Sequence, residues 1–521
     1  MSLPMSRRQF AANSAALSLS AMAPKGLFGE TDSAQKVVIR GDVEIGQVRP
    51  EFHGQFAEHL GSCVYGGLWV GKNSPIPNIN GYRKQAVEYL RELGIPVLRW
   101  PGGCFADDYH WRDGIGPAAA RPKRVNIHWG GYVEDNSFGT HEFIGLCKLI
   151  GAEPYFAGNV GSGSPSELRH WIEYCNYPSG STLADERAAN GSAEPFGIRH
   201  WGVGNESWGC GGAMRPEEYA DLFRRFSVYI REFGGVKPFK VACGPGGDNA
   251  QWSRGVLYGL QKHLPEGLSM HYYQNGKDPA TNFTVEHMDE QLAEFAKLEQ
   301  AIIQQRALLD GYQGGDKVEL IVDEWGVWDR IPREDEKKYG RLWQQSTQRS
   351  AVGAGLGLNI FNRLADKLTM CNIAQIVNVL QSLLLTDGPE GRNCVRTSTY
   401  YTFALFKPHR SKTAVRVEAG GTSPLGLSVS ASKSDRELVV SLVNPHHDDD
   451  MQVDCTLHGF KARGAAAQIL HDPDLNAYNG FDHPDRLVPK SHPVALEGSS
   501  VKMDLPRLSV ATVTLQGSAV G

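Results

Sequence analysis

Short apolar runs alternate with longer amphipathic segments from residue 51 to residue 385, and this alternation constrains the fold more than any other feature. Apolar runs of about four to eight residues are typical of buried strands, and longer periodic segments are typical of helices. Eight runs have the character of strands: 52–58, 96–103, 153–160, 198–206, 239–245, 268–273, 320–325 and 376–385. Helical patterns separate them, for instance 82–93, 141–150, 216–233, 285–309 and 340–358. The alternation predicts an α/β fold, a (β/α)8 TIM barrel with loop insertions.

A doubly wound parallel sheet is the alternative for the same alternation. That fold commonly binds a dinucleotide through a GxGxxG loop after its first strand. No such motif follows residues 52–58, so the barrel is favoured.

The pattern changes near residue 411, where alternating strand-like segments begin. Leu425 to Ser432 and Glu437 to Asn444 flank a turn at Lys433-Ser434-Asp435, which predicts a β-hairpin. Further strands are predicted at 450–457, 465–471, 501–505 and 510–516. We therefore expect a C-terminal antiparallel β-sandwich domain. The expected division is an export signal and linker at 1–35, a strand joining the sandwich at 36–50, the catalytic barrel at 51–400 and the sandwich at 401–521.

Composition argues against two classes of partner. The 521-residue chain has a net charge of −5, a sequence pI of about 6.4 and no basic stripe or Arg/Lys run. Binding sites for nucleic acids and anionic membranes need clustered positive charge, so neither partner is expected.

The N-terminus resembles an export signal. Ser6-Arg7-Arg8-Gln9-Phe10 precedes the mildly apolar stretch Ala11 to Ala23, which indicates a twin-arginine signal and export, to a periplasm. The stretch is too short to span a membrane as a stable helix. The alternative is a tail in which the arginine pair occurs by chance.

The nine cysteines are scattered, without a CxxC pair or zinc-ligand spacing. Nine is an odd number, so at least one is free. We expect mostly free thiols that act as small buried apolar groups, and no metal site.

Two glutamates carry the strongest functional signal. Glu206 ends the run Ile198 to Glu206, and Glu324 ends the run Leu320 to Glu324. A carboxylate at the end of a buried strand is costly to desolvate unless it is paired or used in chemistry. A single Glu in such a place is more often a salt-bridge partner, but two beside Gly- and Trp-rich loops suggest the carboxylate pair of a glycoside hydrolase.

An ordered set of motifs extends this suggestion over the chain from about residue 36 to the C-terminus. The motifs are Phe52-His53-Gly54-Gln55-Phe56-Ala57-Glu58-His59-Leu60, Arg99-Trp100-Pro101-Gly102-Gly103, Tyr109-His110-Trp111-Arg112-Asp113-Gly114-Ile115-Gly116-Pro117, Asn136-Ser137-Phe138-Gly139-Thr140, Gly204-Asn205-Glu206, Met270-His271-Tyr272-Tyr273, Asp323-Glu324-Trp325, Ala374-Gln375-Ile376-Val377-Asn378-Val379 and Thr399-Tyr400-Tyr401. With these motifs the chain resembles the α-L-arabinofuranosidases of glycoside hydrolase family 51. The resemblance implies an exo-acting, retaining enzyme on arabinan, arabinoxylan or their oligosaccharides, with Glu206 as acid/base and Glu324 as nucleophile.

The resemblance also implies roles for the residues around this pair. Glu58 and Gln375 would contact sugar hydroxyls, and Asn205 would bind the 2-hydroxyl. Arg99 would orient a carboxylate, while His271 and Tyr273 would position Glu324. Each has a structural alternative: Arg99 could brace loops, His271 could be a core histidine and Gln375 could cap a strand.

One position departs from the pattern of the family. Many members have Asn after Pro-Gly-Gly, where this chain has Cys104. A thiol is a much weaker hydrogen-bonding group than an amide, so Cys104 is expected to face the sugar and to alter its recognition.

Other functions fit parts of the sequence. The same fold could carry an endo-β-1,4-glucanase or xylanase, or a glycosidase for another furanose, and loop lengths do not separate exo from endo action. A non-catalytic sugar-binding protein is disfavoured because both glutamates are present. The resemblance implies a carbohydrate as partner, no cofactor, and association into homo-oligomers as in relatives.

Overall fold

The computed structural model describes residues 34–419 and 425–520. The chain divides into Met1–Ala34 and a compact unit, Gln35–Gly521. The expected export signal lies outside the described residues.

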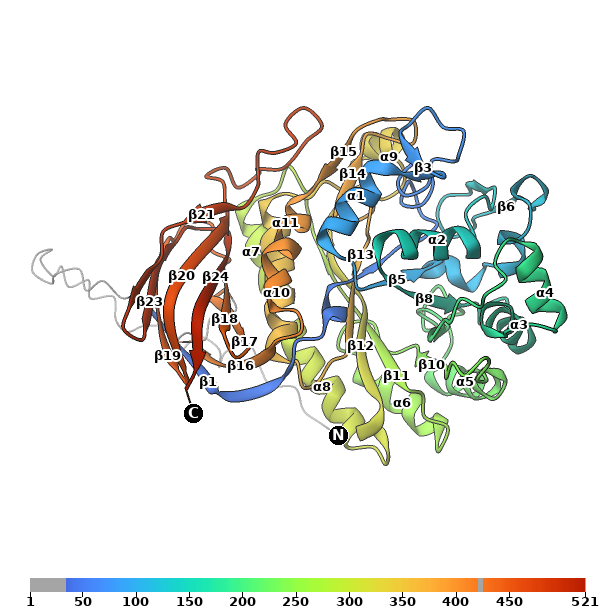
Figure 1. The fold of residues 1–521 in the computed structure, drawn as a ribbon, viewed down its shortest axis with the longest axis horizontal. Helices are drawn as coiled ribbons and strands as arrows, with labels where there is room; N and C mark the ends of the chain where they lie inside the picture. Colours follow the sequence, from blue (N-terminus) through green and yellow to red (C-terminus); the bar gives the residue numbers. More distant parts are fainter. Residues whose placement is uncertain (1–33, 420–424, 521) are drawn as a thin grey trace, which may run out of the picture. The chain divides into compact units, whose positions relative to one another are not determined.

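Eight parallel strands close into a barrel, as the alternation of apolar and amphipathic segments predicted (Figure 1). Around the barrel the order is β10-β11-β12-β13-β2-β5-β8-β9. The bounds are β2 (Gly54–Phe56), β5 (Val97–Trp100), β8 (Glu153–Gly158), β9 (His200–Val203), β10 (Phe239–Ala242), β11 (Gly267–Asn275), β12 (Glu319–Trp328) and β13 (Met370–Ala374). The (β/α)8 prediction is therefore confirmed.

The eighth strand lies upstream of the predicted range 376–385. It is formed by Met370–Ala374, where the polar Asn372 interrupts the apolar run that would have marked it. The predicted range is buried but irregular, with φ of 65° at Asn378 and 52° at Leu380, values that a regular strand excludes. The apolar run 376–385 is therefore a buried irregular segment, and its apolar character reflects burial and not a barrel strand.

Helices follow most of the strands and cover the barrel. Their bounds are α1 (Lys84–Leu93), α2 (Thr140–Ile150), α3 (Pro165–Asn176), α4 (Thr182–Ala189), α5 (Pro216–Tyr229), α6 (Ala250–Leu260), α7 (Val285–Ala296), α8 (Leu298–Asp310), α9 (Arg333–Tyr339), α10 (Gln348–Arg363) and α11 (Ser398–Phe406). Local signals set several ends: Ser164 caps α3 by accepting from Glu167 N, and Gly94 ends α1 with φ of 73°. α10 begins eight residues later than predicted because Gly340 and Leu342 have positive φ.

Ten strands form a second sheet in the order β21-β20-β24-β18-β17-β16-β1-β19-β23-β22. The bounds are β1 (Gln35–Gln47), β16 (Thr413–Ala419), β17 (Ser428–Lys433), β18 (Glu437–Asn444), β19 (Met451–His458), β20 (Phe460–Leu470), β21 (Lys490–His492), β22 (Ala495–Glu497), β23 (Ser500–Leu505) and β24 (Ser509–Ala519). Side chains from distant strands, such as Val501 of β23 and Ala467 of β20, share one apolar core, so the sheet folds over on itself. The sheet is antiparallel except where β1 pairs with β19 in parallel.

The barrel and the sheet share a continuous interface through α10, which contacts β17 and β24 (Figure 1). Asn359 Nδ2 donates to Ser428 O over 3.0 Å. A Cβ on Gly355 would lie 2.9 Å from Val443 Cγ2, so glycine permits this close approach. Within the described residues, no helix combines the length and apolar character that crossing a membrane requires.

Candidate active site

The residues singled out from the sequence gather at the carboxyl ends of the barrel strands. Glu58 follows β2, Arg99 lies in β5, and Cys104 follows β5. The remaining residues come from the other side of the barrel: Asn205 and Glu206 after β9, His271 and Tyr273 in β11, Glu324 in β12, and Gln375 directly after β13. Active sites of such barrels lie at this end, because the loops there converge on the barrel axis.

A bulge in β12 turns two consecutive acidic side chains into the barrel. Met270 pairs with Val322 and His271 pairs with Glu324, so Asp323 is an extra residue in the ladder. Successive side chains of a regular strand would point to opposite faces. Here Asp323 and Glu324 are both buried, and both reach Arg99.

Arg99 connects the two strands that carry the carboxylate pair. Its Nη1 donates to Glu324 Oε1 over 2.6 Å and its Nη2 donates to Asn205 Oδ1 over 2.7 Å. Its Nε lies 3.5 Å from Asp323 Oδ2. Burial opposes the charge of Arg99, but Asp323 and Glu324 outweigh it and raise the pKa of the guanidinium. Arg99 is therefore a fixed cation in the floor of the site.

Glu324 is held as a carboxylate. Burial alone would raise its pKa, but His271, Arg99 and the hydroxyl of Tyr273 outweigh burial, so the pKa lies below its usual range. Tyr273 donates from its hydroxyl to Glu324 Oε2 over 2.7 Å. Both oxygens of Glu324 therefore accept a hydrogen bond, a good setting for a nucleophile that must stay ionised.

Glu206 is the more exposed carboxyl of the pair, with a side chain 20% exposed against 7% for Glu324. His271 Nδ1 lies 2.9 Å from Glu206 Oε1 and 3.6 Å from Glu324 Oε2. The family resemblance implied that His271 positions Glu324, whereas the hydrogen bond of His271 is to Glu206. Burial lowers the pKa of His271, but the charges of Glu324 and Glu206 outweigh this and raise it. One ligand-capable atom each from Glu206, His271 and Glu324 lies within 4.8 Å of the others.

Glu58 accepts three hydrogen bonds. Oε1 accepts from Phe105 N over 3.0 Å and from Trp129 Nε1 over 2.8 Å, and Oε2 accepts from Gln375 Nε2 over 3.0 Å. Burial and the charge of Glu324 nevertheless raise the pKa of Glu58 to about 7. Trp129 lies between β6 (Arg124–Val125) and β7 (Val133–Glu134), outside the motifs that carry the family resemblance.

Asp107 is a second buried carboxyl, and no motif in the sequence marked it. It accepts from three backbone N–H groups: Val160 and Gly161 at Oδ1 and Asn205 at Oδ2. Burial raises its pKa to about 7, although these three donors oppose the rise. It thereby links the loops after β5, β8 and β9.

Cys104 is not a thiol facing the sugar: it forms a disulfide with Cys210, which corrects the expectation. The Cα atoms are 5.5 Å apart and the residues are 106 positions apart in the chain. The two cysteines occupy the loops after β5 and β9, which the barrel brings together. The remaining seven cysteines are free and buried, as expected.

Within the part of the chain that the structure describes, two of three clusters that could offer metal ligands lie in this site. One contains both sulfurs of the disulfide beside Glu206, and the other is Glu206 with His271 and Glu324. A disulfide sulfur is not a thiolate, which is the form of cysteine that binds metals. In the second cluster, His271 Nδ1 already contacts Glu206 Oε1 at 2.9 Å and lies 3.6 Å from Glu324 Oε2.

A closed barrel with a pair of carboxylates at the carboxyl ends of β9 and β12 defines a glycoside hydrolase of the (β/α)8 class. Comparison with known proteins identifies the family. Residues 89–291 match the family description "Alpha-L-arabinofuranosidase 1 domain" and residues 323–509 match "Alpha-L-arabinofuranosidase C-terminal domain". A Bacteroides ovatus protein named "Intracellular exo-alpha-L-arabinofuranosidase" is 42% identical over 93% of this chain and 96% of its own length.

Solved structures agree with this match. The family 51 arabinofuranosidase of Xanthomonas axonopodis pv. citri is 39% identical, with a TM-score of 0.89 over 93% of this chain and all of that one. The Thermotoga maritima α-L-arabinofuranosidase, solved as an arabinose complex, is 28% identical, with a TM-score of 0.83 over 93% of this chain and 100% of that one. The chain belongs to glycoside hydrolase family 51, the α-L-arabinofuranosidases.

The expectation of export is wrong. The B. ovatus relative, which this chain matches over 93% of its length, is named intracellular, and that contradicts a twin-arginine route to the periplasm. The pair Arg7-Arg8 and the short apolar stretch after it are a weak signal, since both occur in tails that address no export machinery.

Proposed function

We propose that this chain removes terminal α-L-arabinofuranosyl residues from arabinan, arabinoxylan and their oligosaccharides, with retention of configuration. The observation that carries the proposal is the pair Glu206 and Glu324, with carboxylate oxygens within 4.8 Å of each other. Retaining enzymes hold their two carboxyl groups roughly 5–5.5 Å apart, whereas inverting enzymes leave room for a water molecule. The name of the B. ovatus relative supports exo action.

Glu324 is the nucleophile in this mechanism. Its carboxylate attacks the anomeric carbon and forms a glycosyl–enzyme ester, while Arg99 and Tyr273 keep it ionised and oriented. As the attack neutralises Glu324, the hydrogen bonds that favoured its charge are weakened. Collapse of the intermediate restores them, and this favours the second step.

Glu206 is the acid/base. It gives its proton to the leaving oxygen in the first step and takes a proton from the attacking water in the second. His271 is placed to exchange a proton with Glu206 Oε1 at 2.9 Å. The greater exposure of Glu206 gives water better access to that carboxyl than to Glu324.

Other side chains have free groups for sugar hydroxyls. Gln375 Oε1 is buried without a hydrogen-bond partner, while its Nε2 holds Glu58. Asn205 Oδ1 accepts from Arg99, which leaves the Nδ2 group, with only a sulfur atom at 4.0 Å, facing the site. An unpartnered buried acceptor is costly, so a sugar hydroxyl at Gln375 would contribute to binding.

We also propose that copies of this chain associate. Four exposed apolar side chains, 49–67% exposed, support this: Val125, Ile127, Tyr132 and Val133 on the β6–β7 hairpin. An exposed apolar cluster favours protein contact. Light scattering of the wild type and of Ile127→Asp tests it: the variant should have the lower mass, and a monomeric wild type would refute association.

The test of activity is a panel of nitrophenyl glycosides with product analysis by NMR. The α-L-arabinofuranoside should be hydrolysed with the highest kcat/KM, and the α-anomer of arabinose should be released first. Preference for a β-glucoside or β-xyloside would support an endo-glucanase or xylanase instead. Release of the β-anomer first would refute retention.

A further inference from the structure

The Cys104–Cys210 disulfide lies beside Glu206 on the side away from His271. Cys210 Sγ is 3.6 Å from Glu206 Oε2, while His271 contacts Oε1. A disulfide sulfur has no proton, so this contact is packing and not a hydrogen bond. The two oxygens of Glu206 therefore meet different neighbours, a proton partner on one side and an inert sulfur on the other.

The loop that carries Glu206 needs external restraints. Glu206 has φ of 42° and Ala213 has φ of 50°, both in the left-handed region that side chains disfavour. Within the loop, the N–H groups of Gly209 and Gly211 donate to Glu206 O. These local bonds shape the loop but do not fix it to the barrel.

Two contacts fix one flank of the loop, towards β10. Ser207 N donates to Cys243 Sγ over 3.3 Å, and Trp208 Nε1 donates to Gly244 O over 3.1 Å. On the flank towards β5, Asp107 and Arg99 hold Asn205, before Glu206, and the disulfide to Cys104 holds the segment after it. Cutting the disulfide would release Cys210, four residues from the acid/base.

We infer that the Cys104–Cys210 disulfide is a positioning device for Glu206, which makes the acid/base step sensitive to thiol reductants. The inference rests on the proposed function. A dithiol reduces the bond by giving two electrons and two protons: two Cys thiols form, and the dithiol becomes a cyclic disulfide. The Cys210 thiol can then donate to Glu206 Oε2, and a donor there favours the carboxylate over the acid that the first step needs.

The two half-buried cysteines form the one disulfide among the described residues, and the other seven are buried free thiols, so a dithiol should act on this bond selectively. Titration of native protein with a thiol reagent should find two accessible thiols after dithiothreitol and none before. The paired variant Cys104→Ala/Cys210→Ala removes the bond without adding a thiol. Cys455→Ala, in β19, is the matched control and should respond to dithiothreitol as the wild type does.

Two arabinofuranosides distinguish positioning of the acid from damage to the fold. A 2,4-dinitrophenyl leaving group departs without protonation, whereas a methyl group needs it. After reduction, kcat/KM should fall by roughly tenfold or more for the methyl glycoside and by less than about threefold for the dinitrophenyl glycoside. The alkaline limb of the pH profile should move to lower pH, and reoxidation should restore both. The paired variant should show the same leaving-group bias and no response to dithiothreitol.

Equal losses on both substrates, or no loss, would overturn the inference. A failure of the proposed function gives a different result, since untreated enzyme would then hydrolyse neither arabinofuranoside.

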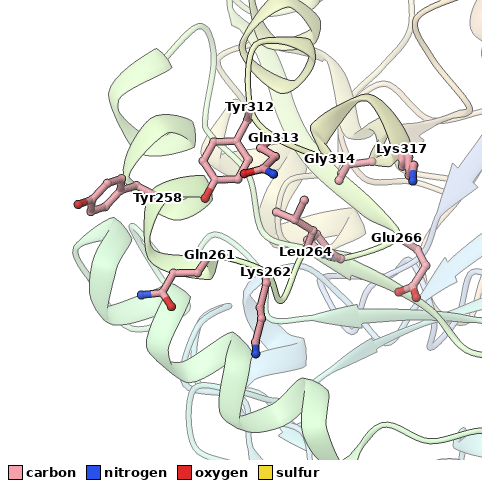
Figure 2. A pocket seen from close by; sticks show the side chains of 11 residues that line it. Tyr258, Gln261, Lys262, Leu264, Glu266, Tyr312, Gln313, Gly314 and Lys317 are labelled. Atoms are coloured by element: carbon pink, nitrogen blue, oxygen red, sulfur yellow. The ribbon is translucent and has the colours of Figure 1, made fainter.

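A separate observation concerns the other end of the barrel, where a hollow of about 920 Å³ opens between the α6–β11 and α8–β12 connections (Figure 2). Tyr258, 80% exposed, and Tyr312 line it. Gly314 and Leu264 also line it, and a Cβ on Gly314 would lie 3.4 Å from Leu264 Cδ1.

Six of the polar side chains that line this hollow have no polar contact within the described residues. Among residues 34–419 and 425–520, no hydrogen bond or ion pair engages the side chains of Tyr258, Tyr312, Gln261, Gln313, Lys262 and Lys317. Glu266, the acidic residue in the lining, already pairs with Lys240 at 3.5 Å. These groups suit an acidic sugar. The two tyrosine rings can stack on sugar rings, the two amides can bond to hydroxyls, and the two lysines can pair with carboxylates.

We propose that this hollow binds uronic-acid-containing glycan segments, apart from the catalytic site. The probe is a galacturonate trimer, titrated into the inactive Glu324→Gln protein, with arabinotriose as the neutral comparison. Tyr258→Ala/Tyr312→Ala and Lys262→Ala/Lys317→Ala should each weaken trimer binding about tenfold or more, whereas Tyr229→Ala, half-exposed on α5, should not. In active enzyme the same pairs should leave nitrophenyl arabinofuranoside hydrolysis unchanged. Unaltered trimer binding in both pairs, or no binding to the parent protein, would overturn the proposal.

Discussion

Arg99 is the residue on which the geometry of the site depends most. It neutralises two buried carboxylates and fixes Asn205 at the same time. Lysine would keep the charge, but its ammonium group could not donate to Glu324 and Asn205 in the planar geometry of a guanidinium. The sequence identified Arg99 through its motif, but not its second carboxylate, because strand alternation would place Asp323 on the other face.

Replacing Arg99 tests this role. In Arg99→Lys, kcat/KM on a nitrophenyl arabinofuranoside should fall at least about tenfold, the cost of a charged hydrogen bond. In Arg99→Ala, the free energy of unfolding should also fall by about 3–5 kcal/mol, because two buried carboxylates lose their partner. Steady-state kinetics and urea unfolding measure both. A stable, active Arg99→Ala would contradict the role.

Glu58 gives a pH prediction at the same scale. Its pKa is raised to about 7 in the folded chain from a usual value of 4.5, so its contribution to stability is present below pH 4.5 and is lost as the pH rises through 7. The loss amounts to about 3 kcal/mol at most, since a tenfold change in proton affinity is worth about 1.4 kcal/mol. Glu58→Gln should flatten the fall in stability between pH 5 and pH 8.

The glutamine can be accommodated because Gln375, whose Oε1 has no partner, can flip its amide and accept. Urea unfolding at several pH values provides the measurement. An equal slope in wild type and Glu58→Gln would show that Glu58 is not the group responsible.

At the scale of elements, the loop after β5 passes close under the nucleophile. A Cβ on Gly103 would lie 2.9 Å from Glu324 Oε1 and 3.4 Å from Asn205 Nδ2. Gly103→Ala should therefore displace the carboxylate and lower kcat/KM about tenfold or more, because small displacements of reacting groups are costly. Gly464→Ala, where an added Cβ meets nothing within 4 Å, is the control. Equal kcat/KM for the two variants would mean that the loop moves aside without displacing Glu324.

The elements also show which parts of the fold and the site could be predicted from the sequence. Seven strand ranges overlap barrel strands, because short apolar segments recur in them at the spacing of the barrel. The eighth was placed too late, at the longer apolar run 376–385 that follows the five residues of β13. The gathering of Glu206 and Glu324 followed from the barrel alone, since all carboxyl ends of parallel strands meet. The disulfide did not follow, because pairing depends on which loops approach each other. Cys104 and Cys210 both lie after predicted strands, and that placement was the one available signal.

At the scale of the whole molecule, the apolar core of the barrel extends into the sheet, which also has a core of its own. Val443, Leu470 and Val510 of the sheet belong to the same buried cluster as Leu356 and Leu358 of α10. An interface this continuous should make the two parts unfold together. Calorimetry should find one transition whose calorimetric and van't Hoff enthalpies agree. Two resolved transitions would show that the sheet melts independently.

Glu206 and Glu324 carry the proposed mechanism, and leaving-group kinetics of their alanine variants test their roles most directly. Glu206→Ala should keep the first step with a 2,4-dinitrophenyl arabinofuranoside and lose it with a methyl arabinofuranoside, because only the second needs an acid. Glu324→Ala should turn over neither, and azide should rescue it with an inverted glycosyl azide as product. Equal losses in both variants on both substrates would contradict the assignment.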